Sequence, residues 1–180
     1  MSPNVSAKFA LFILLPLLHG CQGTGAMDPI NTVNELELQR FMGDWYVIAN
    51  IPTFLEKNAY NPIESYRLEQ DGSIATTFSF NAGAMDGEKK VYRPRGFIVN
   101  SKTNAEWGMQ FIWPIKADYR IVYLDENYQH TIIARNKLDY VWIMARQPEI
   151  SEKMMQELTQ FVASLGYDSS LLEFAPHKIP

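Results

Sequence analysis

The sequence has one cysteine, three histidines and no run of basic residues, and each scarcity excludes a class of protein. With Cys21 as its only cysteine, the chain can form no internal disulfide, which excludes a disulfide-stabilised scaffold. The 16 basic residues are outnumbered by 20 acidic ones and are dispersed, so a nucleic-acid partner is not expected. No repeat of solenoid or propeller period is present either.

Motifs of the common enzyme classes are also missing. The sequence has no Gly-x-Ser-x-Gly elbow, no phosphate-binding loop and no zinc-ligand spacing. The histidines are scattered between the apolar N-terminal segment (His19), a predicted hairpin (His130) and the tail (His177). We therefore predict a protein that is not an enzyme and that uses no metal or cofactor. His130 as a ligand for haem or a metal is kept as an alternative.

The N-terminal segment has the features of a secretory signal. Its apolar run, residues 9–18, is shorter than the roughly 20 residues that span a bilayer, and Lys8 is the only charge in residues 1–20. The following Leu18-His19-Gly20-Cys21 resembles the lipobox of bacterial lipoprotein precursors, which implies cleavage before Cys21 and acylation of that residue. The alternative is a plain signal peptide with an incidental cysteine.

The residues after the cysteine predict where the chain goes and where its domain begins. Gln22 is not the aspartate that resembles an inner-membrane retention signal, so the outer membrane of a Gram-negative bacterium is favoured. Residues 22–34 are polar and small, as in a tether. The predicted organisation is a signal peptide over 1–20, a lipidated N-terminus and tether over 21–34, and one folded domain over 35–180.

Alternation of apolar and polar residues predicts β-strands along the domain. Segment 105–115 is the clearest, since Trp107, Met109, Phe111 and Trp113 share one face. Segment 73–81 repeats the pattern after the Asp71-Gly72 turn, a strong hairpin signal. In total we predict eight strands, at 44–51, 63–69, 73–81, 89–99, 105–115, 118–125, 129–135 and 139–146.

The first and last predicted strands are apolar on both faces, so both faces need cover. A helix is predicted downstream, because Ser151 can cap it, apolar residues follow at helical spacing and Gly166 ends it. We expect this helix outside the seam where the first and last strands meet. The predicted fold is all-β, an eight-stranded antiparallel up-and-down barrel with one C-terminal α-helix packed outside.

These features resemble the lipocalin family. The resemblance rests on Gly43-Asp44-Trp45-Tyr46, on Asp139-Tyr140 with the closing Arg146, on the strand count and on the helix. The lipobox and segments 105–114 and 140–146 make the chain similar to the bacterial outer-membrane lipocalins and, more distantly, to apolipoprotein D. The resemblance implies a structural closed end in which Trp45 plugs the barrel and Arg146 lies across it, next to Gly43.

An eight-stranded barrel is just wide enough to hold one small ligand. Strand parity places the following residues in the lumen: Val47, Ala49, Tyr66, Phe78, Phe80, Met109, Phe111, Trp113, Tyr140 and Trp142. All of these except Val47 and Ala49, eight residues, are predicted to contact the ligand, and for Tyr66, Phe78, Phe111 and Trp142 the resemblance to apolipoprotein D also implies that contact. The alternative for each residue is ordinary core packing. Lys116 and Arg120 could meet a phosphate or carboxylate at the mouth, or could be solvated loop cations.

An aromatic-lined lumen suits an acyl chain. We therefore predict binding, storage or transport of lysophospholipids or fatty acids, by a protein anchored to the outer membrane through acyl chains and serving envelope maintenance. Relatives in the family can pair, so a homodimer is an open expectation. The alternatives are a binder of another hydrophobic ligand, such as an antibiotic or haem, and a lipid-processing enzyme.

Overall fold

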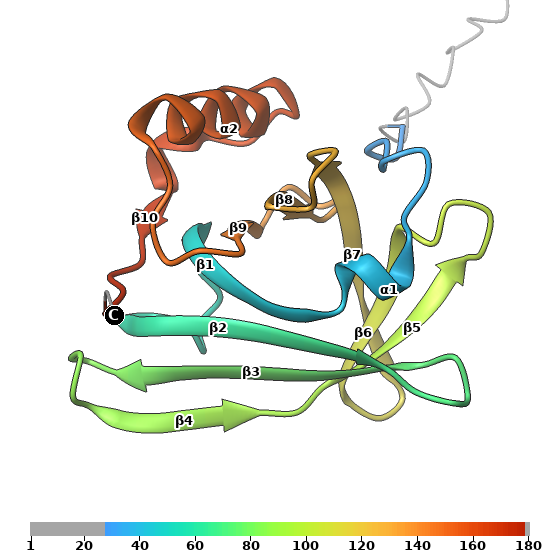
Figure 1. The fold of residues 1–180 in the computed structure, drawn as a ribbon, viewed down its shortest axis with the longest axis horizontal. Coiled ribbons are helices and arrows are strands. Elements are labelled where there is room, and N and C mark those ends of the chain that lie inside the picture. Colours follow the sequence, from blue (N-terminus) through green and yellow to red (C-terminus); the bar gives the residue numbers. More distant parts are fainter. Residues whose placement is uncertain (1–27, 179–180) are drawn as a thin grey trace, which may run out of the picture.

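The computed structural model describes residues 28–178, so the predictions for the signal segment and for Cys21 lie outside the described residues. The described chain is a single β-sheet with two α-helices and one short 3-10 helix (Figure 1). The strands are β1 (Gly43–Ile51), β2 (Ala59–Leu68), β3 (Ile74–Ala82), β4 (Glu88–Tyr92), β5 (Arg95–Asn100), β6 (Glu106–Ile112), β7 (Ile115–Leu124), β8 (His130–Ala134), β9 (Val141–Ala145) and β10 (Glu173–Phe174). The helices are α1 (Leu38–Phe41), α2 (Glu152–Ser164) and the 3-10 helix Ser169–Leu171.

The sheet closes on itself. Neighbouring strands are antiparallel in the order β1-β2-β3-β5-β6-β7-β8-β9, and β9 returns to pair with β1. At this seam Tyr46 lies opposite Ala145 and Ile51 opposite Val141. Strand β4 pairs with β3, and β10 pairs with β1; both lie outside the closed ring of eight strands. The predicted eight-stranded antiparallel barrel is confirmed.

Several strand boundaries differ from the prediction; β2, for example, begins at Ala59 rather than at residue 63, and β7 at Ile115 rather than at residue 118. A proline lies at two further differences. The single strand expected over 89–99 is two strands, β4 and β5, because Pro94 has no N–H to donate to a ladder. Strand β3 accordingly pairs with β4 at Phe78 and with β5 at Ala75. Likewise β6 ends at Ile112 rather than at residue 115, and Trp113-Pro114 forms the turn to β7.

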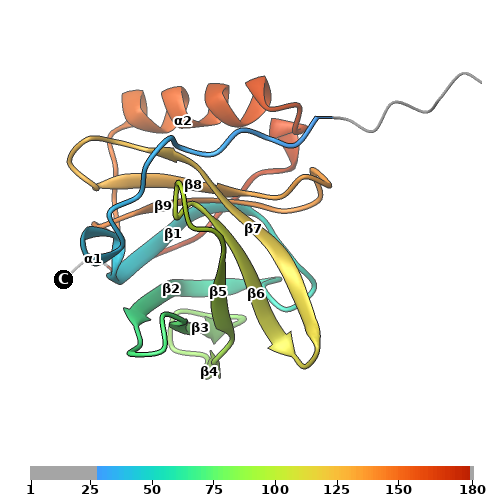
Figure 2. The ribbon, with the colours of Figure 1, turned by 90° about the vertical axis from the view of Figure 1, so that its right-hand side faces the viewer.

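Helix α2 covers the outer face of the barrel at the seam, as predicted (Figure 2). Its N-cap is Ser151, whose Oγ accepts a hydrogen bond from the Met154 N–H at 3.2 Å, and Gly166 beyond its end has a left-handed φ of +99°. The apolar face of the helix packs on four strands of the sheet. The outer cluster contains Ala49 of β1, Val122 of β7, Ile132 and Ala134 of β8, Val141 and Ile143 of β9, Leu158 and Val162 of α2, and Tyr167.

The outer cluster also contains one residue that was predicted to face the lumen. Ala49 was expected in the lumen with Val47, but it is buried under α2. The register of β1 against β9 shifts between these two residues, which marks a bulge. A bulge adds one residue to a strand, so side chains beyond it change faces.

Candidate functional site

The end of the barrel next to α1 is closed by an arginine stacked on a tryptophan. Trp45 is fully buried, and the guanidinium carbon of Arg146 lies 3.8 Å from the centroid of its ring. Arg146 also donates to the backbone carbonyls of Asp44, Arg40 and Met42 at 2.7, 2.8 and 2.9 Å. The side chain therefore ties α1 and the start of β1 to the end of β9.

Gly43 is part of the same arrangement. Its φ of +94° is a conformation that side-chain-bearing residues rarely adopt, and a Cβ there would lie 3.4 Å from Nη1 of Arg146. The structure thus brings Gly43, Trp45 and Arg146 together at one end of the barrel.

Above this end, aromatic rings form a floor inside the barrel. The Tyr66 ring lies 5.6 Å from both Phe41 and Trp107, centroid to centroid, and Trp107 stacks on Tyr119 at 5.8 Å. The hydroxyls of Tyr66 and Tyr119 are hydrogen-bonded to each other. Since these rings are buried, they fill the barrel at this level, and ligand space begins on their other side.

A cavity of about 210 Å³ lies above the floor and reaches the surface at the other end. Residues of the β1–β2 and β8–β9 loops form its mouth, and Phe54 in the first of these loops is 79% exposed. Most of its wall is apolar. The lining residues are Thr53, Phe54, Leu55, Glu56, Glu64, Phe78, Pro94, Met109, Phe111, Ala117, Asp118, Tyr119, Arg135, Tyr140 and Trp142.

Five of the eight predicted ligand-contact residues line this cavity: Phe78, Met109, Phe111, Tyr140 and Trp142. The structure places two of the other three within the core, since Tyr66 belongs to the floor and Phe80 packs beside Phe78 at 5.3 Å. Trp113 lies in the β6–β7 turn, where it is 82% exposed and outside the cavity lining. The register between β6 and β7 shifts between Met109 and Ile112. Alternation counted from Met109 therefore does not predict which way Trp113 faces.

The two cations expected to meet a ligand at the mouth have partners within the protein. The ammonium of Lys116 sits 3.7 Å from the centroid of the Phe97 ring. Arg120 forms ion pairs with Asp118 at 3.0 Å and Glu106 at 3.2 Å, so its charge is already matched. Neither residue lines the cavity.

The cation that does line the cavity is Arg135, which the sequence reasoning missed. It follows β8 directly and makes an ion pair with Asp139 at 3.3 Å. Its guanidinium carbon lies 5.2 Å from the centroid of the Tyr140 ring. An arginine at the end of a strand next to a loop was the available sequence signal.

Two acidic side chains in the cavity were also missed. The first is Glu56, which is 7% exposed and comes from the β1–β2 loop. Its Oε1 accepts a hydrogen bond from Nε1 of Trp142 at 2.7 Å, and its Oε2 accepts one from the N–H of Thr53 at 2.8 Å. Both oxygens therefore have partners, and the loop is tied to the β9 wall.

The second is Glu64 on β2, which has the same parity as Tyr66. Part of its side chain is exposed where it lines the cavity, but its Oε2 is buried and has no hydrogen-bond partner among residues 28–178. Burial raises the pKa of Glu64 to about 8, the charge of Glu56 adds to this, and a hydrogen bond with Tyr66 opposes it. An inward-facing carboxyl of this kind distinguishes the cavity from a purely apolar one.

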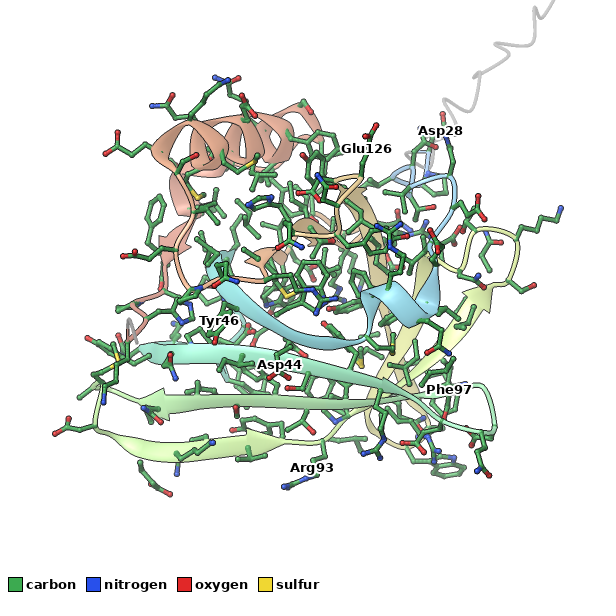
Figure 3. All side chains as sticks on the ribbon, in the orientation of Figure 1. Asp28, Asp44, Tyr46, Arg93, Phe97 and Glu126 are labelled. Atoms are coloured by element: carbon green, nitrogen blue, oxygen red, sulfur yellow. The ribbon has the colours of Figure 1, made fainter. Side chains whose placement is uncertain are left out.

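Among residues 28–178, no group of three or more metal-binding side chains is close enough to hold an ion. Within the same range, no helix combines the length and the apolar character needed to cross a membrane. His130 contacts Asp125 in the β7–β8 hairpin, and Nε2 of His177 donates a hydrogen bond of 2.8 Å to the Val47 carbonyl of β1. Glu126 of the same hairpin points away from the molecule (Figure 3).

Comparison with known proteins identifies relatives over most of the chain. Residues 36–177 match the family model described as a lipocalin-like domain. The chain is 26% identical over 168 residues to the outer membrane lipoprotein Blc of Vibrio cholerae, covering 91% of this chain and 95% of that one. It is 25% identical over 169 residues to bovine apolipoprotein D, covering 86% and 88%. Insecticyanin of the tobacco hornworm has a similar fold, with a TM-score of 0.66 at 15% identity over 83% of this chain and 85% of that one.

Proposed function

The chain belongs to the lipocalin family, and on this premise we propose that its barrel binds a lysophospholipid or a fatty acid for storage or transport. The observation that carries the proposal is the apolar cavity above the aromatic floor, open to the surface beside Phe54 and Phe111. Each CH₂ group moved from water into such a wall contributes about 0.8 kcal/mol. Lipocalins are generally binding and transport proteins, which supports a role without catalysis.

The size of the cavity refines the proposal. Its volume of about 210 Å³ is below the roughly 300–1,000 Å³ usual for ligand pockets. A long acyl chain would therefore place only part of its length inside, with the rest along the rim. The same observation favours a second candidate, a compact hydrophobic molecule such as an antibiotic. Displacement of a bound fluorescent fatty acid by that compound would distinguish the two.

We further propose that residues 1–20 are removed and that acylated Cys21 holds the protein at the outer membrane. The name of the Vibrio cholerae relative, an outer membrane lipoprotein, supports this address. The first described residues run beside the mouth, since the Ile30 N–H donates to Oδ1 of Asn136 in the β8–β9 loop at 2.8 Å. The seven-residue step from Cys21 to Asp28 spans at most about 25 Å. An anchor at Cys21 would thus keep the mouth close to the bilayer.

The rim of the mouth suits that position. Phe54 of the β1–β2 loop and Ile112, Trp113 and Ile115 around the β6–β7 turn are all at least 69% exposed. Exposed apolar groups at one site mark contact with a membrane or a partner, and Trp is favoured at the membrane–water interface. In this proposal the rim touches the bilayer, and a lipid enters the barrel directly from it.

Titration of the full chain with lysophosphatidylcholine or palmitate tests the proposal. Trp142 lines the cavity, so occupancy should change its fluorescence. We expect saturation near one ligand per barrel, or per pair of barrels if two copies associate, which sedimentation would establish. Glycerophosphocholine, which has the headgroup without the chain, is the control and should cause no change. Absence of saturable binding with both lipids would contradict the proposal.

A further inference from the structure

Glu64 occupies a position that the binding of an apolar chain does not explain. In the strand ladder it lies opposite Trp45 on one side and Phe78 on the other, two residues from Tyr66. It therefore enters the barrel next to the aromatic floor, away from the exposed rim. Its buried Oε2 has no partner within residues 28–178.

Most of the charged and titratable groups that share the cavity are paired with other groups. Glu56 has hydrogen bonds at both oxygens, and the hydroxyls of Tyr66 and Tyr119 are hydrogen-bonded to each other. Tyr66 also shares a hydrogen bond with the Glu64 carboxyl, which leaves Oε2 of Glu64 without a partner in the described part of the chain. At the mouth, Arg135 pairs with Asp139 through Nη1, while its buried Nε has no hydrogen-bond partner among residues 28–178. The remaining acid, Asp118, pairs with Arg120 and accepts a hydrogen bond from the Asn136 N–H at 2.8 Å. Among these described groups, none forms an ion pair with Glu64.

A buried carboxyl without a full set of partners is costly, so the ligand that fits best supplies the missing donor. A carboxylate in this place would add a like charge beside Glu64 and Glu56. A bare methyl end would cover the carboxyl and leave it unpaired. A protonated amine would donate a charge-assisted hydrogen bond, which is about twice as strong as a neutral one.

We propose that Glu64 anchors the polar end of the ligand and that the barrel selects a single-chain amphiphile ending in a protonated amine, which enters amine first. This inference rests on the proposed function, since it needs an apolar ligand in the barrel. The alkyl chain would then run past Phe78, Met109 and Trp142 towards the exposed rim. The headgroup would lie inside, rather than at the mouth where a headgroup was expected.

The ionisation of Glu64 predicts that ligand affinity depends on pH. With a pKa of about 8, raised by burial and by Glu56, the carboxyl of the free protein holds its proton at neutral pH. Binding of an ammonium group releases that proton, so affinity for an amine should rise from pH 6 to pH 8 and level off above. Affinity for a carboxylate of the same chain length should fall over this range.

The experiment compares decylamine, decanol and decanoate by calorimetric titration of the full chain at pH 6 and pH 8. At pH 8 we expect decylamine to bind about tenfold or more tightly than decanoate. The Glu64→Gln variant should remove most of this preference, so that decylamine and decanoate bind with affinities within about twofold of each other. The control Glu126→Gln removes an equal charge from the exposed hairpin and should change nothing.

Each outcome decides something. The inference would be overturned if the wild-type protein bound decylamine and decanoate equally, or if Glu64→Gln kept the preference for decylamine. In either case, binding of decanol would leave the proposed function standing. Failure of all three compounds to bind would overturn both. If the variant does not fold, the pH dependence of decylamine binding by the wild-type chain decides, and a flat dependence overturns the inference.

Discussion

Replacement of Glu64 by glutamine should stabilise the protein, and the gain should depend on pH. The pKa of this carboxyl is about 8 in the folded protein against an ordinary value of 4.5. Because the folded-state pKa is raised, the folded protein holds the proton more tightly than the unfolded chain does. The contribution of Glu64 to stability is therefore fully present below pH 4.5 and is lost as the pH rises towards 8. At pH 7 the loss is on the order of 3 kcal/mol.

Urea unfolding of Glu64→Gln and of the wild-type protein at pH 5, 7 and 8 measures this effect. The introduced amide has the shape of the protonated acid without its titration, so the two proteins should be about equally stable at pH 5. The variant should be more stable by a few kcal/mol at pH 8. Glu126→Gln, in the exposed hairpin, is the matched control. A stability difference that does not change with pH, or a variant less stable than the wild type at pH 8, would refute the reasoning.

Three further predictions concern the closed end, the cavity and the rim. Arg146→Met removes the stacking on Trp45 and the hydrogen bonds to backbone carbonyls, and should lower the free energy of unfolding by about 2–4 kcal/mol in urea titrations. Ala117→Phe places a ring in the cavity and should weaken binding of lysophosphatidylcholine about tenfold or more in fluorescence titrations. The control Val99→Phe, on an exposed surface, should leave lysophosphatidylcholine binding unchanged. Trp113→Ser should reduce co-sedimentation with phospholipid vesicles several-fold, with lysophosphatidylcholine affinity unchanged.

The fold could be predicted because its determinants are local. Alternation marked the strands, Asp71-Gly72 marked a turn, and Ser151 with Gly166 bounded the helix. The errors occur where a local pattern is interrupted by long-range pairing. Nothing in the residues around Ala49 signals the bulge that turns its side chain outwards, since that bulge exists only in the register of β1 against β9.

The site was predictable only in part, because parity identifies the apolar wall and not its polar exceptions. Phe78, Met109 and Trp142 share the apolar pattern of their strands, were predicted to face the lumen and line the cavity. Glu64 was missed because an acid in a strand is usually a solvent-facing residue, and only closure of the barrel shows which face is inside. Arg120 was misplaced for a related reason, since Glu106 becomes its partner only through the pairing of β6 with β7.

The central claim is that the open, apolar cavity holds a single-chain lipid. Native mass spectrometry of the protein isolated from its own membrane tests this claim most directly. We expect a mass increment of one acyl-bearing molecule per barrel, or per pair of barrels, that is released on denaturation. Protein that carries no such molecule, and that gains none after incubation with lysophosphatidylcholine, palmitate or decylamine, would contradict it.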